Sequence, residues 1–413
     1  MAGVGILGYG TVGSGVYEVL KINKEIIKRK AGEEIEVKKV LDLRDFPGDE
    51  AEKILTHDFE DILNDESIDV VAEVMGGVEP AFTFSKRAME KGKSVVTSNK
   101  ALVAEKGPEL LKIAKENNVN YMFEASCGGT IPVIRPLNTS LTSDDILKIK
   151  GILNGTTNYI LTKMTEEGKT FEEVLKTAQQ LGYAEADPTA DVEGHDACRK
   201  IAILSSVAFG ATVDYKEILT EGITKITAKD IAYAKALNCV IKLIAGSEKT
   251  AEGVSAKVSP CLISNKHPLA SVNNAFNAIF VQGNMSGETM YYGSGAGKLP
   301  TAAAVVGDII DEVKSKGTHK AIDWNVDETI HVLSADKSEV KCFVRVAFEN
   351  KEAAKAAVEK IFGTDKFTEI PEAEGEFAFL TGKETEKSIN EKRDILSADN
   401  SVKEVINIIR VEE

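Results

Sequence analysis

The chain has 413 residues, of which 43% are hydrophobic and 28% charged, a composition typical of a folded globular protein. This length favours two or three domains over a single core. The net charge of −15, with no stretch that concentrates Lys and Arg, argues against a nucleic-acid partner. No apolar run is long enough to cross a membrane and a strand begins almost at Met1, so we expect no membrane segment, no signal peptide and a cytoplasmic protein.

The cysteines are odd in number, scattered and without a CxxC pair. This pattern is typical of a reducing compartment and argues against a disulfide scaffold or a thiolate zinc site. The five positions are Cys127, Cys198, Cys239, Cys261 and Cys342.

Apolar runs alternate with helical patterns over the first 126 residues, which predicts an α/β fold with a doubly wound parallel sheet. We expect strands at 3–10, 34–45, 69–77, 93–100 and 119–126, and helices at 13–30, 81–92 and 105–118.

The rest of the chain mixes helices with antiparallel strands. We expect strand structure at 145–155, 239–248, 253–263 and 277–284, and helices at 157–168, 170–182, 194–211 and 299–316. Residues 316–338 contain the only tryptophan and no clear element, and we interpret them as a linker. Beyond it, the order β-α-β-β-α-β predicts a small ferredoxin-like domain.

The stretch GILGYGTVG places glycines directly after the first strand and at the start of a helix. Gly8, Gly10 and Gly13 fit the dinucleotide-binding fingerprint, in which the glycines make the turn, admit a pyrophosphate and allow close helix packing. Thr11 and Val12 open the helix, whose N-terminus attracts phosphate. A plain tight turn is the alternative, and the position before a five-strand pattern favours the dinucleotide site.

The second strand ends in LDLRD, which leaves the choice of cofactor open. Asp42 would favour NAD by accepting a hydrogen bond from the ribose 2′-hydroxyl, whereas Arg44 would favour NADP by binding the 2′-phosphate. We prefer Arg44, although a solvated arginine is a close alternative. At the carboxyl end of the fourth strand, Ser98 and Lys100 stand where ligands bind in such sheets.

The segment 182–200 is rich in acidic residues and leads into a helix. Asp196 and Lys200 are four residues apart, so their side chains share one helix face. A buried, paired lysine is a plausible general acid, whereas an exposed pair would be an ordinary surface ion pair.

Five stretches, in this order and spacing, closely resemble homoserine dehydrogenases over residues 1–320: GILGYGTVG, TSNKALV, LNGTTNYIL, GYAEADPTADVEGHDACRK and YYGSGAGKLPTAAAVVGD. The tail resembles an ACT domain. The resemblance implies a Rossmann domain of residues 1–130 and 294–320, an α+β catalytic and dimerisation domain of residues 131–293, and an ACT-like regulatory domain of residues 335–413. It implies reversible reduction of L-aspartate 4-semialdehyde to L-homoserine with NADPH or NADH, on the route to threonine and methionine.

The resemblance also implies roles for single residues. Lys200 would donate the proton, and Lys100 would lie beside the nicotinamide and hold the reacting oxygen. The substrate would be bound by Glu185, Asp196 and Asp191. Ser98, Gly182, Gly295 and Gly297 would line the cofactor, together with the glycine turn.

Further expectations from the resemblance concern a cation and partners. A sodium ion would be bound by a carboxylate and main-chain carbonyls at positions matching Glu124, Cys127, Gly129 and Ile131. The ACT-like tail would bind an amino-acid effector, threonine above all, or serve only to build a homodimer or homotetramer.

Two other functions compete with this interpretation. Aspartate-semialdehyde dehydrogenase chemistry needs a reactive cysteine and a histidine base, which do not stand in suitable places here. A non-catalytic sensor of amino acids or dinucleotides is the second alternative, and the retained Asp196 and Lys200 argue against it.

Overall fold

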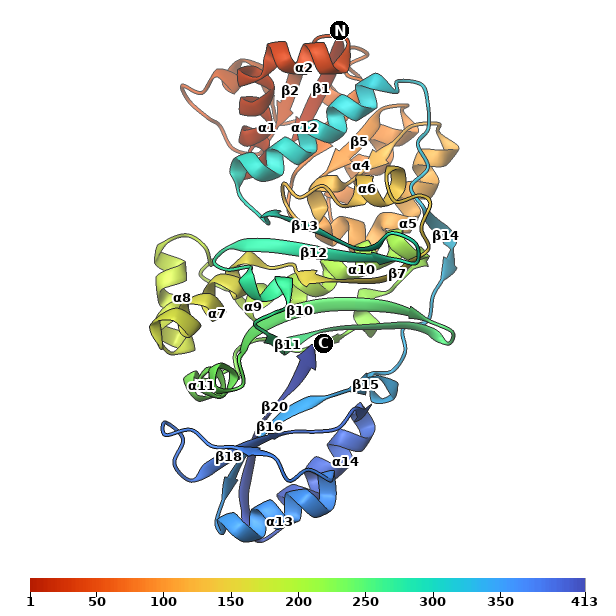
Figure 1. The fold of residues 1–413 in the computed structure, drawn as a ribbon. Helices are drawn as coiled ribbons and strands as arrows, with labels where there is room; N and C mark the ends of the chain where they lie inside the picture. The colour runs from red at the N-terminus through yellow and green to blue at the C-terminus, as the bar shows by residue number, and fades with distance from the viewer. Residues whose placement is uncertain (413) are drawn as a thin grey trace. The chain divides into compact units, whose positions relative to one another are not determined.

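The structure is a computed structural model that describes residues 1–412. The chain forms two compact units, and each is described by itself (Figure 1). The first unit comprises residues 1–147, 202–214 and 282–330, and the second comprises residues 148–201, 215–281 and the chain from 331 onward. No helix among residues 1–412 is long and apolar enough to span a membrane.

A six-stranded parallel sheet forms the centre of the first unit, with strand order β3-β2-β1-β4-β5-β6. This is the doubly wound order of dinucleotide-binding domains, as expected. The strands are β1 (Ala2–Leu7), β2 (Ile35–Leu41), β3 (Leu55–Thr56), β4 (Val70–Glu73), β5 (Ser94–Thr97) and β6 (Tyr121–Met122). The helices are α1 (Thr11–Ile22), α2 (Lys24–Ala31), α3 (Glu60–Leu63), α4 (Ala81–Glu90), α5 (Lys100–Glu116) and α6 (Ile134–Thr139).

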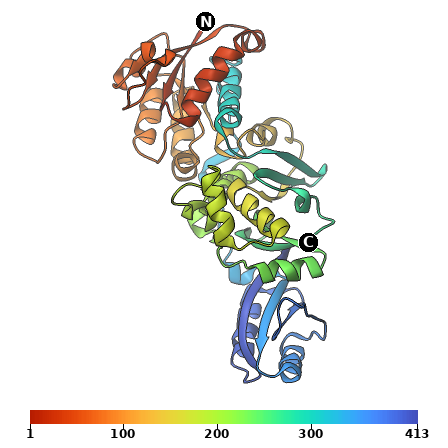
Figure 2. The ribbon, with the colours of Figure 1, turned by 90° about the vertical axis from the view of Figure 1, so that its left-hand side faces the viewer.

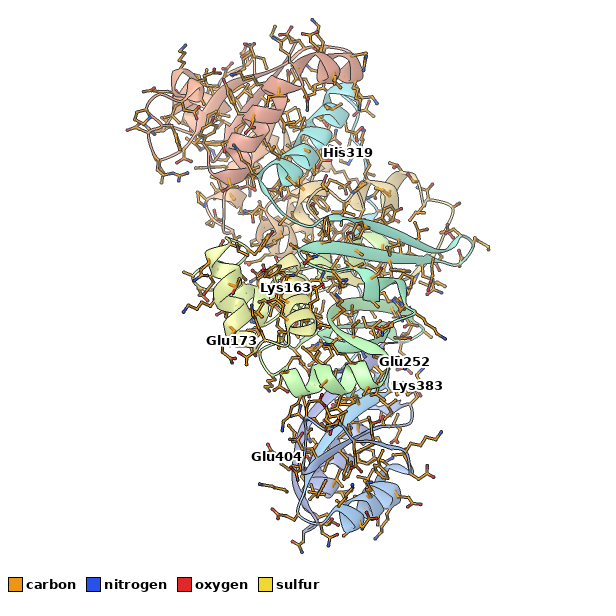
Figure 3. The ribbon with its side chains drawn as sticks, turned by 60° about the vertical axis from the view of Figure 1, so that its left-hand side comes forward. Lys163, Glu173, Glu252, His319, Lys383 and Glu404 are labelled. Atoms are coloured by element: carbon orange, nitrogen blue, oxygen red, sulfur yellow. The ribbon has the colours of Figure 1, made fainter. Side chains whose placement is uncertain are left out.

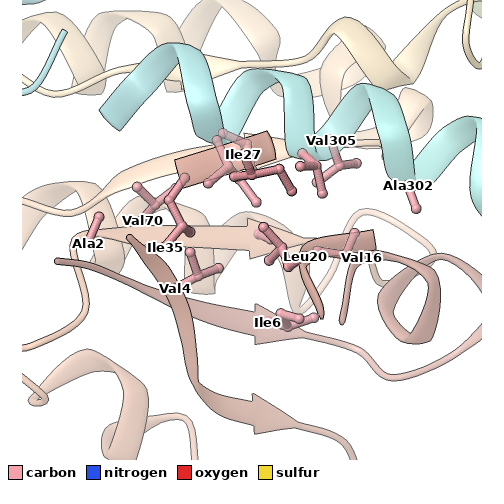
Figure 4. Packing of buried hydrophobic residues seen from close by; sticks show 14 of the residues in the cluster. Ala2, Val4, Ile6, Val16, Leu20, Ile27, Ile35, Val70, Ala302 and Val305 are labelled. Carbon is pink, nitrogen blue, oxygen red and sulfur yellow. The ribbon is translucent and has the colours of Figure 1, made fainter. Parts of the chain in front are cut away.

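A late segment, α12 (Lys298–Lys314), returns to this sheet and packs against α1. Its apolar face joins one hydrophobic cluster with β1 and α1, as Figure 4 shows for Val16, Leu20, Ala302 and Val305. The two helices approach so closely that a Cβ on Gly15 would lie 2.9 Å from the Cβ of Ala302. Glycine therefore allows the helix contact on which this cluster depends.

The expected linker is wrong in part, because it contains β14 (Trp324–Thr329), which pairs in parallel with β8 (Gly210–Thr212). The Trp324 indole is 5% exposed and donates a hydrogen bond to Thr212 Oγ1 at 3.0 Å. The partner strand is more than one hundred residues away in the chain, so no local pattern announces this pairing. The remaining strand of the first unit is β13 (Gly287–Ser294).

The second unit contains a long sheet of order β12-β7-β10-β11-β20-β16-β18-β17. Its core strands are β7 (Ile146–Ile152), β10 (Cys239–Thr250), β11 (Gly253–Ser264) and β12 (Phe276–Gly283), and β9 (Leu219–Thr220) pairs with β11. The helices are α7 (Gly155–Glu167), α8 (Phe171–Gln180), α9 (Thr189–Val192), α10 (His195–Phe209) and α11 (Ala228–Ala236). Figure 2 shows α7 and α8, in yellow and yellow-green, side by side, and Figure 3 labels Lys163 on α7 and Glu173 on α8.

The tail has the expected order β-α-β-β-α-β. Its elements are β16 (Cys342–Phe348), α13 (Lys351–Phe362), β17 (Phe367–Thr368), β18 (Glu376–Leu380), α14 (Glu386–Ser397) and β20 (Val402–Glu412). The strand order β20-β16-β18-β17, antiparallel throughout, is that of a ferredoxin-like fold. The strand β17 is only two residues long, and Pro371, which lacks an N–H, follows it.

The end of β20 also pairs in parallel with β11 through residues 410–412, so the tail continues the sheet of the second unit. A separate two-stranded antiparallel sheet pairs β15 (Glu339–Val340) with β19 (Glu384–Thr385).

Candidate active site

The glycine turn joins β1 to α1 with the geometry that a phosphate site needs. Gly8 has φ +95°, a conformation that favours glycine, and a Cβ on Gly13 would lie 1.9 Å from the Gly8 carbonyl oxygen. Gly10 precedes α1, whose first turn has no acidic residue and whose N-terminus has no side-chain cap. The N–H groups of this helix end therefore remain available for an anion, and Thr11 and Val12 lie at that end.

Asp42 and Arg44 lie together at the tip of β2, beside this turn. The carboxylate of Asp42 accepts a hydrogen bond from the Tyr9 N–H at 2.7 Å and two from the Arg44 guanidinium at 3.0 Å each. These donors, Arg44 first, lower the pKa of Asp42 to about 2. Arg44 is exposed and lies over the Phe46 ring at 5.2 Å. The structure thus brings both ribose-recognition candidates to one place, already paired with each other.

The turn after β5 is held by a network that the sequence analysis did not identify. Asn99 caps α5 by accepting from the Leu102 N–H at 3.1 Å and donates to the Gly77 carbonyl at 2.6 Å. Lys100 is the first residue of that helix, and both Ser98 and Lys100 are partly buried. Ser98 and Lys100 thereby lie at the carboxyl ends of the strands, the edge at which ligands bind in sheets of this class.

Glu73, at the end of β4, is hydrogen-bonded to the residue that precedes this turn, Thr97. Its carboxylate is fully buried and accepts hydrogen bonds from the Thr97 hydroxyl at 2.6 Å and the Met75 N–H at 2.9 Å. Burial raises the pKa of Glu73 to about 7. A carboxylate at the end of an otherwise apolar strand was the signal in the sequence that could have identified Glu73 as a residue of this region.

The loop expected to bind a cation packs against the glycine-rich turn before α12. Thr130 N–H donates to the Ser294 carbonyl at 3.2 Å, and a Cβ on Gly129 would lie 2.6 Å from the Gly295 carbonyl. Gly297, with φ +129°, then precedes α12. The structure therefore places the candidate cation loop and the candidate cofactor glycines of this region side by side.

The Glu124 carboxylate in this loop is already engaged. It accepts hydrogen bonds from the main-chain N–H groups of Val133, Ile134 and Arg135 at 2.6–2.9 Å, which caps α6. Within residues 1–412, no three or more His, Cys, Asp or Glu side chains gather into a group that could hold a metal ion. A cation at this loop would therefore be bound by main-chain carbonyls.

In the second unit, Asp196 and Lys200 form a buried pair. Lys200 Nζ donates to Asp196 Oδ2 at 2.7 Å and to the Leu153 carbonyl at 2.9 Å. The two residues are 2% and 7% exposed, so the alternative of a surface ion pair is wrong. A buried pair of this kind needs a partner for each charge, which makes both residues hard to replace singly.

Asn154 connects this pair to a second carboxylate. Its amide nitrogen donates to Asp196 Oδ2 at 2.9 Å and to Asp191 Oδ1 at 2.7 Å. Its side-chain oxygen meanwhile caps α7 by accepting from the Thr157 N–H. The motif LNGTTNYIL, which the sequence analysis used only as a family signature, therefore supplies Asn154 to the cluster of Asp191, Asp196 and Lys200.

The other candidates of this segment are not drawn into the cluster. Glu185 is exposed, and its main-chain carbonyl accepts from the Gln179 side chain at 3.1 Å. Gly182, with φ +77°, is exposed at the end of α8. Cys198 is buried and its thiol donates to the Tyr215 carbonyl, in agreement with a packing role.

A parallel sheet of order 3-2-1-4-5-6 with a phosphate-binding glycine turn, in one chain with a buried lysine–carboxylate pair, defines an NAD(P)-dependent oxidoreductase. Comparison with known proteins then specifies the family. The family model described as "Homoserine dehydrogenase, NAD binding domain" matches residues 8–124, and the one described as "Homoserine dehydrogenase" matches residues 132–310. The chain belongs to the homoserine dehydrogenase family.

Individual relatives agree with this assignment. The homoserine dehydrogenase of Mycobacterium bovis is 40% identical over 99% of this chain and 97% of its own length. The crystal structure of a homoserine dehydrogenase from Thiobacillus denitrificans matches with a TM-score of 0.93 and 36% identity, covering 100% of this chain and 98% of that one. A hyperthermophilic archaeal homoserine dehydrogenase in complex with NADPH matches with a TM-score of 0.64 and 30% identity, covering 75% of this chain and 97% of that one.

Proposed function

We propose that the chain reduces L-aspartate 4-semialdehyde reversibly to L-homoserine, with Lys200 as the proton donor. The observation that carries this assignment is the buried contact of Lys200 with Asp196 and the Leu153 carbonyl. Two acceptors hold the ammonium in one position, and a proton donor must be positioned in this way to reach the oxygen on which negative charge develops.

The reaction needs little covalent chemistry from the protein. NAD(P)H, when bound, supplies the hydride that reaches the carbonyl carbon. The Lys200 ammonium gives its proton to the carbonyl oxygen, so that the aldehyde becomes an alcohol, and the neutral amine takes a proton in the reverse direction. Lys100, at the positive end of α5, would hold the same oxygen and stabilise its negative charge.

The carboxylates of the second unit would receive the ammonium group of the substrate. Asn154 fixes Asp191 and Asp196 relative to each other, which supports their use as one binding surface. Glu185 would join them from its exposed segment when substrate binds. This last role rests on the resemblance to the family.

The cofactor would be bound by the glycine turn, Ser98, Gly182, Gly295 and Gly297. NADP is favoured over NAD because Arg44 stands at the tip of β2 with an exposed guanidinium. In this proposal the 2′-phosphate would compete with Asp42 for that guanidinium. If Asp42 keeps the Arg44 guanidinium, this cation is not left for a 2′-phosphate, and NAD, whose ribose carries only hydroxyls there, would be the preferred cofactor.

A sodium ion would be bound by the main-chain carbonyls of Glu124, Cys127, Gly129 and Ile131. The Glu124 carboxylate serves the N-terminus of α6, which limits it to an indirect electrostatic contribution. Carbonyl ligands suit a monovalent cation because they add no charge to the site.

The ferredoxin-like tail supports a role as an ACT-like regulatory domain that binds an amino acid, with threonine as the natural end product of the pathway. Such domains pair with a second copy, so we propose a homodimer or homotetramer. Production of homoserine would serve threonine and methionine biosynthesis.

Oxidation of L-homoserine with NAD+ and NADP+ in parallel tests the central proposal. Lys200→Ala is expected to lower kcat by at least three orders of magnitude, whereas Lys176→Ala, an exposed lysine on α8, leaves it unchanged. Activity that survives in Lys200→Ala would remove this residue from the mechanism. A folded wild-type protein without activity would favour the sensor function instead.

A further inference from the structure

A polar cavity of about 410 Å³ lies within the second unit, where the tail joins the sheet. Its walls come from β7, β10 and β11 on one side, and from residues 337–341, Lys383 and the end of β20 on the other. Figure 3 labels Lys383 on the tail. None of the residues assigned above to catalysis, substrate or cofactor lines it.

Positive charge predominates in these walls. Seven of the lining side chains are Lys or Arg and three are Glu, in a chain whose net charge is −15. Each of the three carboxylates is contacted by a lining lysine: Glu412 by Lys150 at 3.0 Å, Glu248 by Lys148 at 3.6 Å, and Glu339 by Lys383 at 3.6 Å. Two further carboxylates also oppose these cations, since Glu386 lies 3.9 Å from Lys257 and binds Arg410 together with Glu221. Seven cations thus face five carboxylates, and a bound anion would relieve the repulsion among the cations.

The donors suit a tetrahedral phosphoryl group better than a carboxylate. The one arginine, Arg410, already binds Glu386 and Glu221 with bidentate contacts, so no free planar fork is offered to a carboxylate. The remaining cations are lysine ammonium groups, which bind phosphate as point charges. The hydroxyls of two fully buried serines, Ser247 and Ser259, and of two others, Ser255 and Ser338, also line the cavity.

The strand β7, which forms one wall of the cavity, connects the cavity to the candidate active site along the chain. Lys148 and Lys150 project from β7, and the chain continues from this strand to Leu153 and Asn154, which contact Lys200 and Asp196. Lys150 is itself buried, with 8% of its side chain exposed, so its position is coupled to that of the strand.

We propose that this cavity is a binding site for a small phosphorylated anion, either inorganic phosphate or a phosphate monoester. The ligand would join the tail to β7, β10 and β11. This proposal is independent of the reaction proposed above, since it needs no cofactor and no substrate.

Isothermal titration calorimetry on the full chain tests the proposed phosphate site. The probes are inorganic phosphate, pyrophosphate and glycerol 3-phosphate, with succinate as the carboxylate comparison. We expect a dissociation constant below 1 mM for at least one phosphorylated probe, weakened by added KCl. In the variant Lys148→Gln/Lys257→Gln/Lys341→Gln, we expect binding at least tenfold weaker. The matched control Lys30→Gln/Lys176→Gln/Lys387→Gln, which removes equal charge from exposed helix positions, is expected to bind within twofold of the wild type.

The variant Gly13→Ala separates this cavity from the dinucleotide site, which also attracts phosphate. Binding that persists in Gly13→Ala and is lost in the cavity variant supports the proposal. Three results would overturn it: no binding to the wild type, loss of binding in Gly13→Ala alone, or equal affinity for succinate. Preferred binding of glycerol 3-phosphate over phosphate would identify the ligand as a monoester.

Discussion

The buried Asp196–Lys200 pair makes a prediction about stability that does not depend on the reaction. Asp196→Asn leaves the Lys200 ammonium without a carboxylate, and Lys200→Met leaves the Asp196 carboxylate without its cation. Because both residues are less than a tenth exposed, water cannot replace the missing charge. Breaking a buried pair by removing one partner costs about 3–5 kcal/mol.

The double variant Asp196→Asn/Lys200→Met removes both charges and leaves mainly lost hydrogen bonds. The Leu153 carbonyl loses one donor, which costs about 1–3 kcal/mol, and Asn154 can still donate to the amide oxygen at position 196. The double variant should therefore be less destabilised than the sum of the single variants by at least about 2 kcal/mol.

Urea-induced unfolding followed by circular dichroism measures these free energies at pH 7.5. A matched pair, Lys163→Met and Glu166→Gln, tests an exposed contact at 2.8 Å on α7, for which a coupling below about 1 kcal/mol is expected. Additive costs for Asp196→Asn and Lys200→Met would refute the reasoning, because they would mean that the two charges do not compensate each other in the folded protein.

Three further predictions concern the first unit. Between pH 4.5 and 7 the folded state holds a proton on Glu73 that the unfolded chain has lost, so the free energy of unfolding should fall by about 3 kcal/mol as pH rises through this window. Glu73→Gln should remove that dependence in urea titrations at pH 5 and 8, and an unchanged pH profile would contradict the assignment. Gly13→Ala should raise KM for both cofactors at least tenfold because its Cβ meets the Gly8 carbonyl, whereas Gly382→Ala, which faces open space, should not. Arg44→Ala should raise KM for NADP+ about tenfold or more with little effect on NAD+; an equal effect on both would exclude it as the 2′-phosphate contact.

Much of the architecture follows from local patterns. Alternating apolar strands and helices were sufficient to predict the parallel sheet, because strands buried on both faces must be apolar. Gly13 of the first turn was recognisable because a Cβ there would meet the carbonyl of Gly8, five residues earlier in the chain, which is a local requirement. The spacing of Asp196 and Lys200 placed them on one helix face, since that follows from the helical repeat alone.

Contacts between distant segments were decided only by the tertiary structure. Whether Asp196 and Lys200 are buried depends on what covers α10, and their partners Leu153 and Asn154 lie more than forty residues earlier. The segment around Trp324 was interpreted as a linker because its partner strand, β8, lies more than one hundred residues earlier and leaves no local pattern. In the same way, β20 pairs with β11 across about 150 residues. The sequence by itself thus determined which elements form and which residues can carry charge or close turns, since these depend on neighbours along the chain. Burial, the hydrogen bond from the Tyr9 N–H to Asp42, and the lysine-lined cavity required the fold, because each depends on which groups far apart in the chain meet in space.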